Sequence, residues 1–412
     1  MESGRSPRVC YFMTRLIVSS PVWSLNGINV FSAELAARLL AKGHDAQLLL
    51  TGVTYREQKP LSLPRNIPVV QLPIPRRATW AARRESLRRY LEASAPCVYF
   101  PNHDFNHSCI TASLSPGVGV IGIVHSDDEQ HYDHFRRLGG TWNAVVAVSE
   151  HISSRLSGYV ADRSRLHTIP YGVRTADRNP QRKDRPLRIL YTGRLDEKQK
   201  HVGDLIGIAR RLQDRSVRFD MSIVGDGPER NRLSKAIGDA GLSQCVRLTG
   251  SVEHQRVLEL CSAHDVMVLP SSYEGMPLSI LEAMGHGCIP VVRRSASGIP
   301  ELIDNGVNGL IIEGGDTDAF AARIELIARD SKLRERMSEQ AWNTIYRGQF
   351  QLDVMVERYL ALIDRVQTEM LESTFVRRTP ADPCPHLSLR DIIAAPLWSL
   401  RPAIRAQQDL PN

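Results

Sequence analysis

Two glutamates in an apolar stretch of the chain are the residues whose chemistry most needs an explanation. Glu274 and Glu282 lie in S-S-Y-E-G-M-P-L-S-I-L-E-A-M-G-H-G-C-I-P-V-V, residues 271–292, where most neighbours are apolar or small. Burying a carboxylate costs free energy unless a donor group pairs with it. An ionised carboxylate accepts hydrogen bonds on both oxygens, so it can bind the vicinal hydroxyls of a ribose or another sugar.

The segment between the two glutamates predicts an anion site. Pro277 favours the first position of a helix, where the N–H group that it lacks is not needed. Such a helix, directly after Gly275, would leave the backbone N–H groups of Met276, Leu278 and Ser279 free at its positive end. A carboxylate beside a diphosphate would be repelled, so we expect the glutamates to bind hydroxyls on either side of it. The pattern therefore indicates a nucleotide-sugar ligand.

A plainer interpretation of the glutamates stays open. Glu274 would then only complement the helix dipole, which is worth about 0.3–1 kcal/mol, and Glu282 would be an exposed helical residue.

Positive charge follows a predicted strand in G-R-L-D-E-K-Q-K. Arg194 and Lys200, next to Gly193, would lie at the carboxyl end of that strand and stabilise the charge on a departing diphosphate. A solvated basic loop is the alternative, and Lys198 is a second candidate for the phosphate contact. Further on, Gly225 in V-G-D-G-P-E predicts a tight turn where a side chain would obstruct a ligand.

Short apolar runs alternate with helical patterns along the chain, which predicts βαβ units and parallel sheets. We expect strands near residues 9–18, 45–50, 97–100, 118–124, 144–148, 188–192, 219–224, 246–249, 266–270 and 288–292. We expect helices over residues 31–42, 202–213, 229–240 and 254–263, after Ser149 and after Pro277, and near the C-terminus.

The composition narrows the class of protein. The net charge of +7 over 412 residues comes without a concentrated basic motif, so we expect small anionic partners and no nucleic acid. The seven scattered cysteines form no C-x-x-C pair, which is typical of a reduced, cytoplasmic protein. Since no apolar run approaches the roughly 20 residues of a membrane helix, we expect at most peripheral contact with the inner membrane face.

Five ordered motifs resemble the retaining glycosyltransferases of family 4. They are the E-x7-E region at residues 274–282, Y-T-G-R-L-D-E-K-Q-K, I-V-G-D-G-P-E-R, V-R-L-T-G-S-V and S-G-I-P-E-L-I-D-N-G-V-N-G-L-I-I. The resemblance covers most of the C-terminal half. It implies an α/β chain of the GT-B fold, with two Rossmann-like parallel-sheet domains facing across a cleft. It also implies retaining, metal-independent transfer of a sugar from a nucleotide-diphosphate-sugar to a hydroxyl acceptor, with no cofactor.

The resemblance also suggests roles for individual residues. Arg194 and Lys200 would hold the donor phosphates, and Lys200 is favoured over Lys198 because K-H-V stands where the family has K-G-V or K-G-I. His125, at the end of a predicted strand, would face the donor sugar; an ordinary capping histidine is the alternative. Gly27 would lie in a loop that closes over the phosphates.

Two segments depart from the family pattern. Asn26-Gly27 followed by Asn29 replaces the usual paired-glycine loop and its glutamate, so a purely structural helix entry is the alternative for this turn. Asp127-Asp128 is similar to a D-x-D metal motif, but the GT-B fold generally orients its donor without a metal, so we expect no metal site there.

The expected domains follow from these motifs. They are an acceptor-binding domain over residues 1–175, a linker over 176–186, a nucleotide-sugar-binding domain over 187–345, and C-terminal helices and a tail over 346–412 that pack back towards the first domain. The acceptor would be a glycan, a lipid-linked molecule or a small molecule. A basic amphipathic helix between residues 76 and 90 would either contact anionic lipid or form a solvated face. An inactive sugar-nucleotide-binding scaffold and a GT-B epimerase or phosphorylase are the alternative functions.

Overall fold

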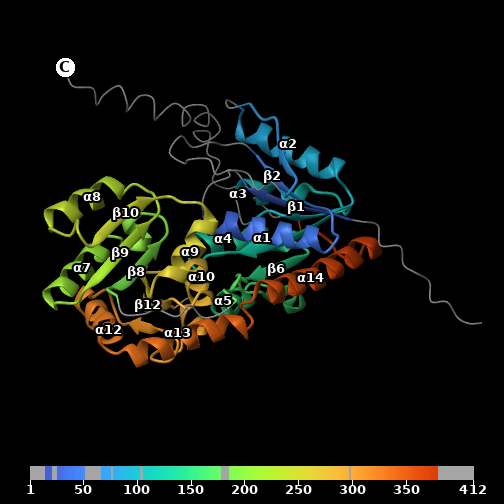
Figure 1. Ribbon diagram of the computed structural model, residues 1–412. Coiled ribbons are helices and arrows are strands. Elements are labelled where there is room, and N and C mark those ends of the chain that lie inside the picture. Colours follow the sequence, from blue (N-terminus) through green and yellow to red (C-terminus); the bar gives the residue numbers. More distant parts are fainter. Residues whose placement is uncertain are drawn as a thin grey trace, which may run out of the picture.

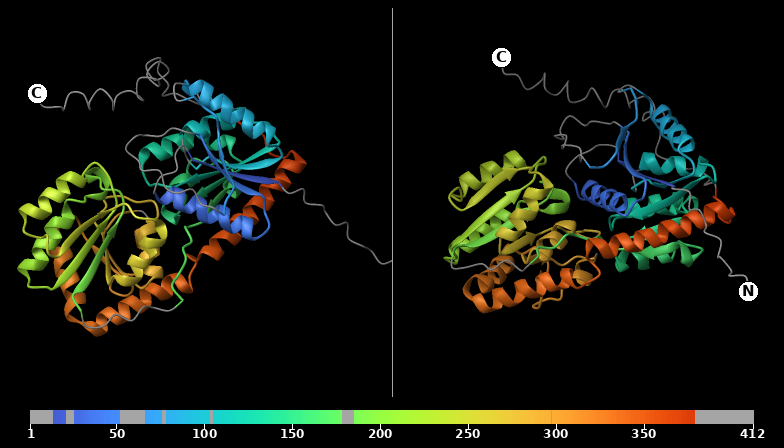
Figure 2. Two further views of the ribbon diagram at one scale, coloured as in Figure 1. Left: turned by 45° about the horizontal axis from the view of Figure 1, so that its top comes forward. Right: turned by 45° about the vertical axis from the view of Figure 1, so that its right-hand side comes forward.

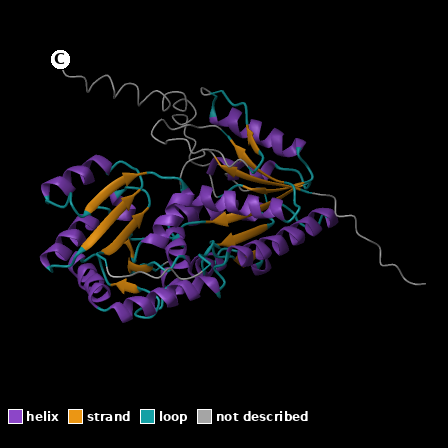
Figure 3. Ribbon diagram, in the orientation of Figure 1, coloured by secondary structure: helices purple, strands orange, loops and turns teal. Residues whose placement is uncertain are grey.

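The computed structural model describes residues 14–20, 26–51, 66–75, 78–102, 105–177, 185–296 and 298–378. These residues form two α/β domains joined near residue 175 and by the C-terminal helix (Figure 1). Helices flank the strands of both domains (Figure 3). The buried strands are therefore covered on their faces, as parallel sheets require.

The N-terminal domain is built on a seven-stranded parallel sheet with the order β3-β2-β1-β4-β5-β6-β7. Its strands are β1 (Arg15–Ser20), β2 (Ala46–Leu50), β3 (Val69–Gln71), β4 (Cys97–Phe100), β5 (Val118–Val124), β6 (Ala144–Ala147) and β7 (Leu166–Thr168). Its helices are α1 (Gly27–Ala41), α2 (Trp80–Ala93), α3 (Phe105–Ser108), α4 (Glu129–Leu138) and α5 (Glu150–Ser157), with short 3-10 turns at Cys109–Ser113, Gly139–Thr141 and Arg163–Arg165.

The C-terminal domain repeats this winding in a six-stranded parallel sheet with the order β10-β9-β8-β11-β12-β13. Its strands are β8 (Leu187–Thr192), β9 (Phe219–Val224), β10 (Val246–Gly250), β11 (Val266–Leu269), β12 (Ile289–Arg293) and β13 (Leu310–Ile312). Its helices are α6 (Glu197–Lys200), α7 (Asp204–Asp214), α8 (Arg230–Asp239), α9 (His254–Ala263), α10 (Leu278–Gly285), α11 (Ile299–Leu302), α12 (Thr317–Arg329) and α13 (Ser331–Tyr346).

The last helix, α14 (Leu352–Glu372), returns from the second domain to the first (Figure 2). It packs against β4, β5 and α1. At its start, the N–H of Val173 donates to the carbonyl of Phe350 at 2.9 Å, and the N–H of Leu352 donates back to Val173 at 3.1 Å. After it, Arg377 donates to the carbonyls of Thr141 and Val118. The chain therefore crosses between the domains twice.

Some elements differ from the sequence-based expectations. Helix α1 begins at Gly27 rather than residue 31, because the side chain of Asn26 accepts the N–H of Asn29 at 2.9 Å and caps the helix earlier. The strands β3, β7 and β13 were not expected; each has three residues and lies at the edge of a sheet. The expected strand residues 9–13, the linker residues 178–184 and the tail 379–412 lie outside the described residues.

Candidate functional site

The N-terminal ends of two helices meet at the domain boundary. Helix α10 follows β11 and is preceded by Pro277, whose carbonyl accepts the N–H groups of Ile280 and Leu281. A β-carbon on Gly27, at the start of α1, would lie 3.8 Å from the Cβ of Leu278, at the start of α10. The free N–H groups and the positive dipole ends of both helices therefore converge between the domains, which favours an anion there.

Glu274 is buried beside Lys200. The Nζ atom of Lys200 lies 2.5 Å from Oε1 of Glu274, and the two side chains are 18% and 9% exposed. Lys200 ends the short helix α6, and this helix is tied to the loop of Glu274 because the N–H of Ser272 donates to the carbonyl of Gln199 and Nε2 of Gln199 donates to that of Tyr273. The structure therefore places the lysine at the loop that precedes α10, whereas Lys198 is exposed.

Arg194 lies in the loop between β8 and α6 and projects into solvent. Its side chain is 60% exposed. Its Nη2 atom donates to Oε1 of Gln199 at 3.2 Å, and its carbonyl accepts the hydroxyl of Tyr191 at 2.8 Å. Arg194 is therefore linked through Gln199 to the segment that carries Lys200, with a guanidinium that is accessible to an anion.

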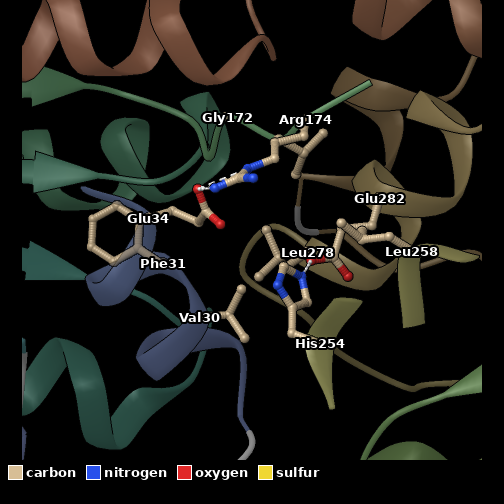
Figure 4. A pocket seen from close by; sticks show the side chains of 10 residues that line it. Val30, Phe31, Glu34, Gly172, Arg174, His254, Leu258, Leu278 and Glu282 are labelled. Carbon is tan, nitrogen blue, oxygen red and sulfur yellow. Dashed lines mark hydrogen bonds and ion pairs between the residues drawn. The ribbon is translucent and has the colours of Figure 1, made fainter. Parts of the chain in front are cut away.

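Glu282 pairs with a histidine that the sequence did not single out. Nε2 of His254, the first residue of α9, lies 2.5 Å from Oε1 of the buried Glu282. Both residues line a pocket between the domains. Figure 4 shows a second ion pair on the same pocket, in which Arg174 donates to Oε2 of Glu34 on α1 at 2.9 and 3.1 Å.

His125 is buried at the carboxyl end of β5. Its Nδ1 atom lies 2.6 Å from the hydroxyl of Tyr171, and its Nε2 atom has no hydrogen-bond partner among the described residues. Burial lowers the pKa of His125 to about 3, so the ring is neutral at ordinary pH. A β-carbon on Gly275 would lie 2.0 Å from the carbonyl oxygen of His125. Only glycine allows the loop after Glu274 to approach the first domain this closely.

Gly193, Gly225 and Met276 lie at close packing contacts within the C-terminal domain. Gly225 has a φ of +144°, and a β-carbon on it would lie 1.8 Å from the carbonyl oxygen of Gly193. The two glycines therefore let the loops after β8 and β9 pack together. A side chain at residue 225 would clash with the backbone of Gly193, whereas the sequence predicted that it would obstruct a ligand. Met276 is buried, and its Cε atom would lie 2.6 Å from a β-carbon on Gly298.

The side chain of Glu301, in the S-G-I-P-E-L motif of the second domain, contacts the first domain. Its carboxylate accepts the backbone N–H groups of Glu150 and His151, at 2.9 and 2.8 Å. These groups begin α5 in the first domain, where the side chain of Ser149 also caps the helix through the N–H of Ile152. A carboxylate at a helix N-terminus satisfies free donors and complements the dipole. Glu301 therefore ties the two domains together.

A network of polar side chains occupies the carboxyl edge of the N-terminal sheet. His107 joins Ser19 and Thr51 through its two ring nitrogens, at 3.0 and 2.7 Å. Nearby, Nδ2 of Asn102 donates to the hydroxyl of Ser32 at 2.7 Å. All five residues are buried. The sequence carries no short motif for this network, because its members come from separate strands and helices.

Two further segments carry charges that are bound within the chain. Oδ1 of Asp127 accepts the hydroxyl of Tyr132 at 2.6 Å, and Asp128 caps α4 through the N–H of His131. The described residues contain no cluster of three or more histidine, cysteine, aspartate or glutamate side chains suited to a metal ion.

In α2, Arg88 and Arg89 both pair with Glu85. Over the described part of the chain, every helix is too short or too polar to cross a bilayer.

Comparisons with known proteins agree with this architecture. The chain is 32% identical over 203 residues to the amylovoran biosynthesis glycosyltransferase AmsK of Erwinia amylovora, covering 47% of this chain and 49% of that protein. It is 37% identical over 158 residues to the alpha-D-kanosaminyltransferase of Streptomyces kanamyceticus, covering 38% of this chain and 40% of that protein. The matched part thus spans about half the length of these curated relatives, or less.

Among solved structures, Anabaena HepE in complex with UDP matches with a TM-score of 0.68 at 15% identity, over 86% of this chain and 100% of that chain. This likeness and the two parallel sheets confirm the GT-B fold. The family model described as "Glycosyltransferase Family 4" matches residues 25–177, and the one described as "Glycosyl transferases group 1" matches residues 173–344. Because the two models together span both domains, the chain belongs to the glycosyl transferases of group 1, family 4.

Proposed function

We propose that this protein transfers a sugar from a nucleotide-diphosphate-sugar to a hydroxyl acceptor, with retention of configuration and without a metal or other cofactor. The observation that carries the proposal is the ion pair between the part-buried Lys200 and the buried Glu274 beside the N-terminus of α10. A lysine and free helical N–H groups favour a diphosphate, while the adjacent carboxylate favours sugar hydroxyls. A nucleotide-sugar has both parts.

In this proposal the charges act on the departing diphosphate. Lys200, the accessible guanidinium of Arg194 and the N-terminus of α10 would stabilise the negative charge that grows on the leaving phosphate. Gly27, at the facing N-terminus of α1, would bring further N–H groups from the other domain. Glu282 would accept the ribose hydroxyls. In this arrangement, positive charge contacts the diphosphate of the donor, and the two carboxylates contact the sugars on either side of it.

The roles of Glu274 and His125 support retention. With a pKa of about 3, the buried His125 is a weak base, so it suits a hydrogen bond to a sugar hydroxyl rather than general-base chemistry. Glu274 is neutralised by Lys200. We therefore assign no enzyme nucleophile: the leaving phosphate would accept the proton of the acceptor hydroxyl as that hydroxyl attacks from the same face of the sugar.

The names of the relatives bear on the substrates. AmsK is named for the biosynthesis of amylovoran, the Streptomyces protein for transfer of kanosamine, and HepE was solved with UDP. They support a nucleotide-sugar donor and a glycan or small-molecule acceptor, and a lipid-linked acceptor remains part of the proposal. Membrane contact through α2 would accompany a lipid-linked acceptor; its pairs with Glu85 reduce the free charge of that face.

The test is a donor panel followed by product analysis. UDP-, GDP- and ADP-sugars are screened by thermal shift, and the donor that binds is incubated with hydroxyl acceptors, with and without EDTA. We expect a glycoside with the donor's anomeric configuration by NMR, at a rate that EDTA leaves unchanged. Binding without product would favour an inactive scaffold. Conversion of the donor alone would favour an epimerase, and inversion or loss of rate with EDTA would contradict the mechanism.

A further inference from the structure

The contact between His254 and Glu282 gives the carboxylate a fixed partner. Nε2 of His254 lies 2.5 Å from Oε1 of Glu282, and the two side chains are 28% and 8% exposed. Glu282 lies in α10, just over one turn after Leu278, so it is close to the helix end proposed to bind the diphosphate. The histidine begins α9, which belongs to a different strand–helix unit of the same domain.

The charges around His254 come from three other elements. Glu282 on α10 and Glu34 on α1 are negative, and Arg174 in the connection between the domains is positive. On its own helix, Arg256 pairs with Glu259 on the exposed side. Burial lowers the pKa of His254, but the hydrogen bond to Glu282 and the two carboxylate charges outweigh burial, so the pKa lies above its usual value.

We propose that His254 is a positioning residue, which holds the Glu282 carboxylate in place for the ribose of the nucleotide donor. The inference rests on the proposed function and deepens it. A carboxylate that accepts both ribose hydroxyls must be held in one rotamer, and a hydrogen bond to one oxygen provides that restraint at a cost of only one acceptor position.

The charge of the histidine serves the same end. An isolated carboxylate near a diphosphate would repel it, and the repulsion is strong because the surroundings are partly buried. An imidazolium beside Glu282 offsets that negative charge. Arg174 cannot take over this task, because its guanidinium is already bound to Glu34. The donor therefore meets a carboxylate that is oriented and whose charge is offset while His254 carries its proton.

Three variants test the inference by calorimetric binding. His254→Ala removes the contact, His254→Gln keeps an N–H donor without the charge, and Gln255→Ala changes the next, exposed position of α9 as a matched control. The ligands are UDP and GDP, together with their 2′,3′-dideoxy forms. Circular dichroism and thermal melting confirm that each variant is folded. If His254→Ala does not fold, the test relies on His254→Gln, whose nucleotide-sugar affinity is measured as a function of pH.

For the ribonucleotide, we expect the Kd of His254→Ala to rise about tenfold, with partial rescue in His254→Gln and no change in Gln255→Ala. For the dideoxy form, His254→Ala and the parent should differ less than about twofold, because the ribose contact is then absent. Tighter ribonucleotide binding by His254→Ala would overturn the proposal, since the histidine would then compete with the ribose. An equal loss with both ligands would overturn it as well.

The pH profile gives a second readout. It uses an intact nucleotide-sugar, whose diphosphate diester does not titrate near neutral pH. Because His254 must carry a proton to offset Glu282, the parent's affinity should fall as pH rises through the raised pKa of His254, and His254→Gln should lack this fall. Equal pH profiles contradict the proposal. If the parent binds none of the nucleotides, the proposed function fails too, whereas binding that is insensitive to His254 refutes only this inference.

Discussion

The two sheets share one winding order, yet the side chains at their carboxyl edges differ in charge. In the C-terminal domain the loops after the strands carry Arg194, Lys200 and Glu274. In the N-terminal domain the equivalent edge carries the hydroxyl of Thr51 and the uncharged ring of His125. The carboxylates of Asp127 and Asp128, in the loop after β5, are bound within the chain by Tyr132 and His131. The same backbone thus presents positive and negative charge on one side of the boundary, and hydroxyls and an uncharged imidazole on the other.

This difference separates fold from chemistry. A parallel sheet dictates only that the loops after its strands gather at one edge; the residues in those loops decide what binds there. Charges suit a diphosphate, whereas neutral donors and acceptors suit hydroxyl groups. We therefore propose that the donor's phosphates bind at the C-terminal edge, and the following variants test this placement.

The largest effect is expected for Lys200→Ala. Removing the charge should lower kcat by about 10²- to 10³-fold, as loss of a group that stabilises transition-state charge does. Lys198→Ala is the matched control, because Lys198 is exposed and should retain nearly full activity. Steady-state kinetics with saturating donor measure both.

Lys200→Ala also leaves the buried Glu274 without its partner, which should destabilise the fold by about 3–5 kcal/mol. Combining Lys200→Met with Glu274→Gln should restore much of the stability but none of the activity. Recovery of activity in this double variant would remove the positive charge from the mechanism.

A smaller effect, on stability, is expected for His125→Phe. The native ring resists protonation down to a pKa of about 3, whereas the unfolded ring takes up a proton below about 6.5. The unfolded state therefore gains protons first, and the parent should lose stability as pH falls below 6.5. As pH falls from about 7 to about 5, protonation of His125 in the unfolded state should lower the free energy of unfolding by about 2 kcal/mol. Urea unfolding should show a flatter pH dependence in the variant; equal slopes would mean that His125 is charged in the native state.

The next variant is Glu301→Ala, which removes the hydrogen bonds that Glu301 of the C-terminal domain accepts from the N-terminal domain. Losing both acceptors at the start of α5 should cost about 1–2 kcal/mol. Ser149→Ala removes a cap from the same helix without crossing the boundary. X-ray scattering should show a larger radius of gyration, with weaker donor binding, only for Glu301→Ala. Equal changes in the two variants would show that the cap, and not the tie, matters.

The smallest effect is expected for Thr51→Val, which keeps the shape but removes the hydroxyl that contacts His107. Loss of one buried hydrogen bond should cost about 1 kcal/mol. If the neutral edge binds the acceptor, the KM for the acceptor should rise several-fold while the donor Kd is unchanged. A shift in the donor Kd alone would reverse the assignment of the two edges.

Much of the fold was predictable because its signals are local. The spacing of Val257, Leu258 and Cys261 places one apolar face on α9, and the expected bounds of that helix agree with the structure. The strands β3, β7 and β13 were missed, because three residues are too few to show a period, and an edge strand is paired on one side only. The early start of α1 depended on the cap at Asn26.

The candidate site was predictable in part. The sequence indicated Glu274, Glu282 and Lys200 as chemically unusual. It did not indicate which residue would pair with which, and it passed over His254 and Glu301. Lys200 and Glu274 are separated by 74 positions, and Glu301 and His151 by 150. No local pattern encodes contacts of that range.

The sequence by itself determined the alternation of strands and helices, the helix start near Pro277 and the kinds of charge available, since these depend on neighbouring residues and on composition. Only the tertiary structure decided which charges neutralise each other and which ring is kept uncharged. The physical reason is that the cost of an ionised group depends on its exposure to water and on its nearest charge. Both are properties of segments that meet only when the chain has folded, within one domain for Lys200 and Glu274 and between the domains for Glu301 and the start of α5.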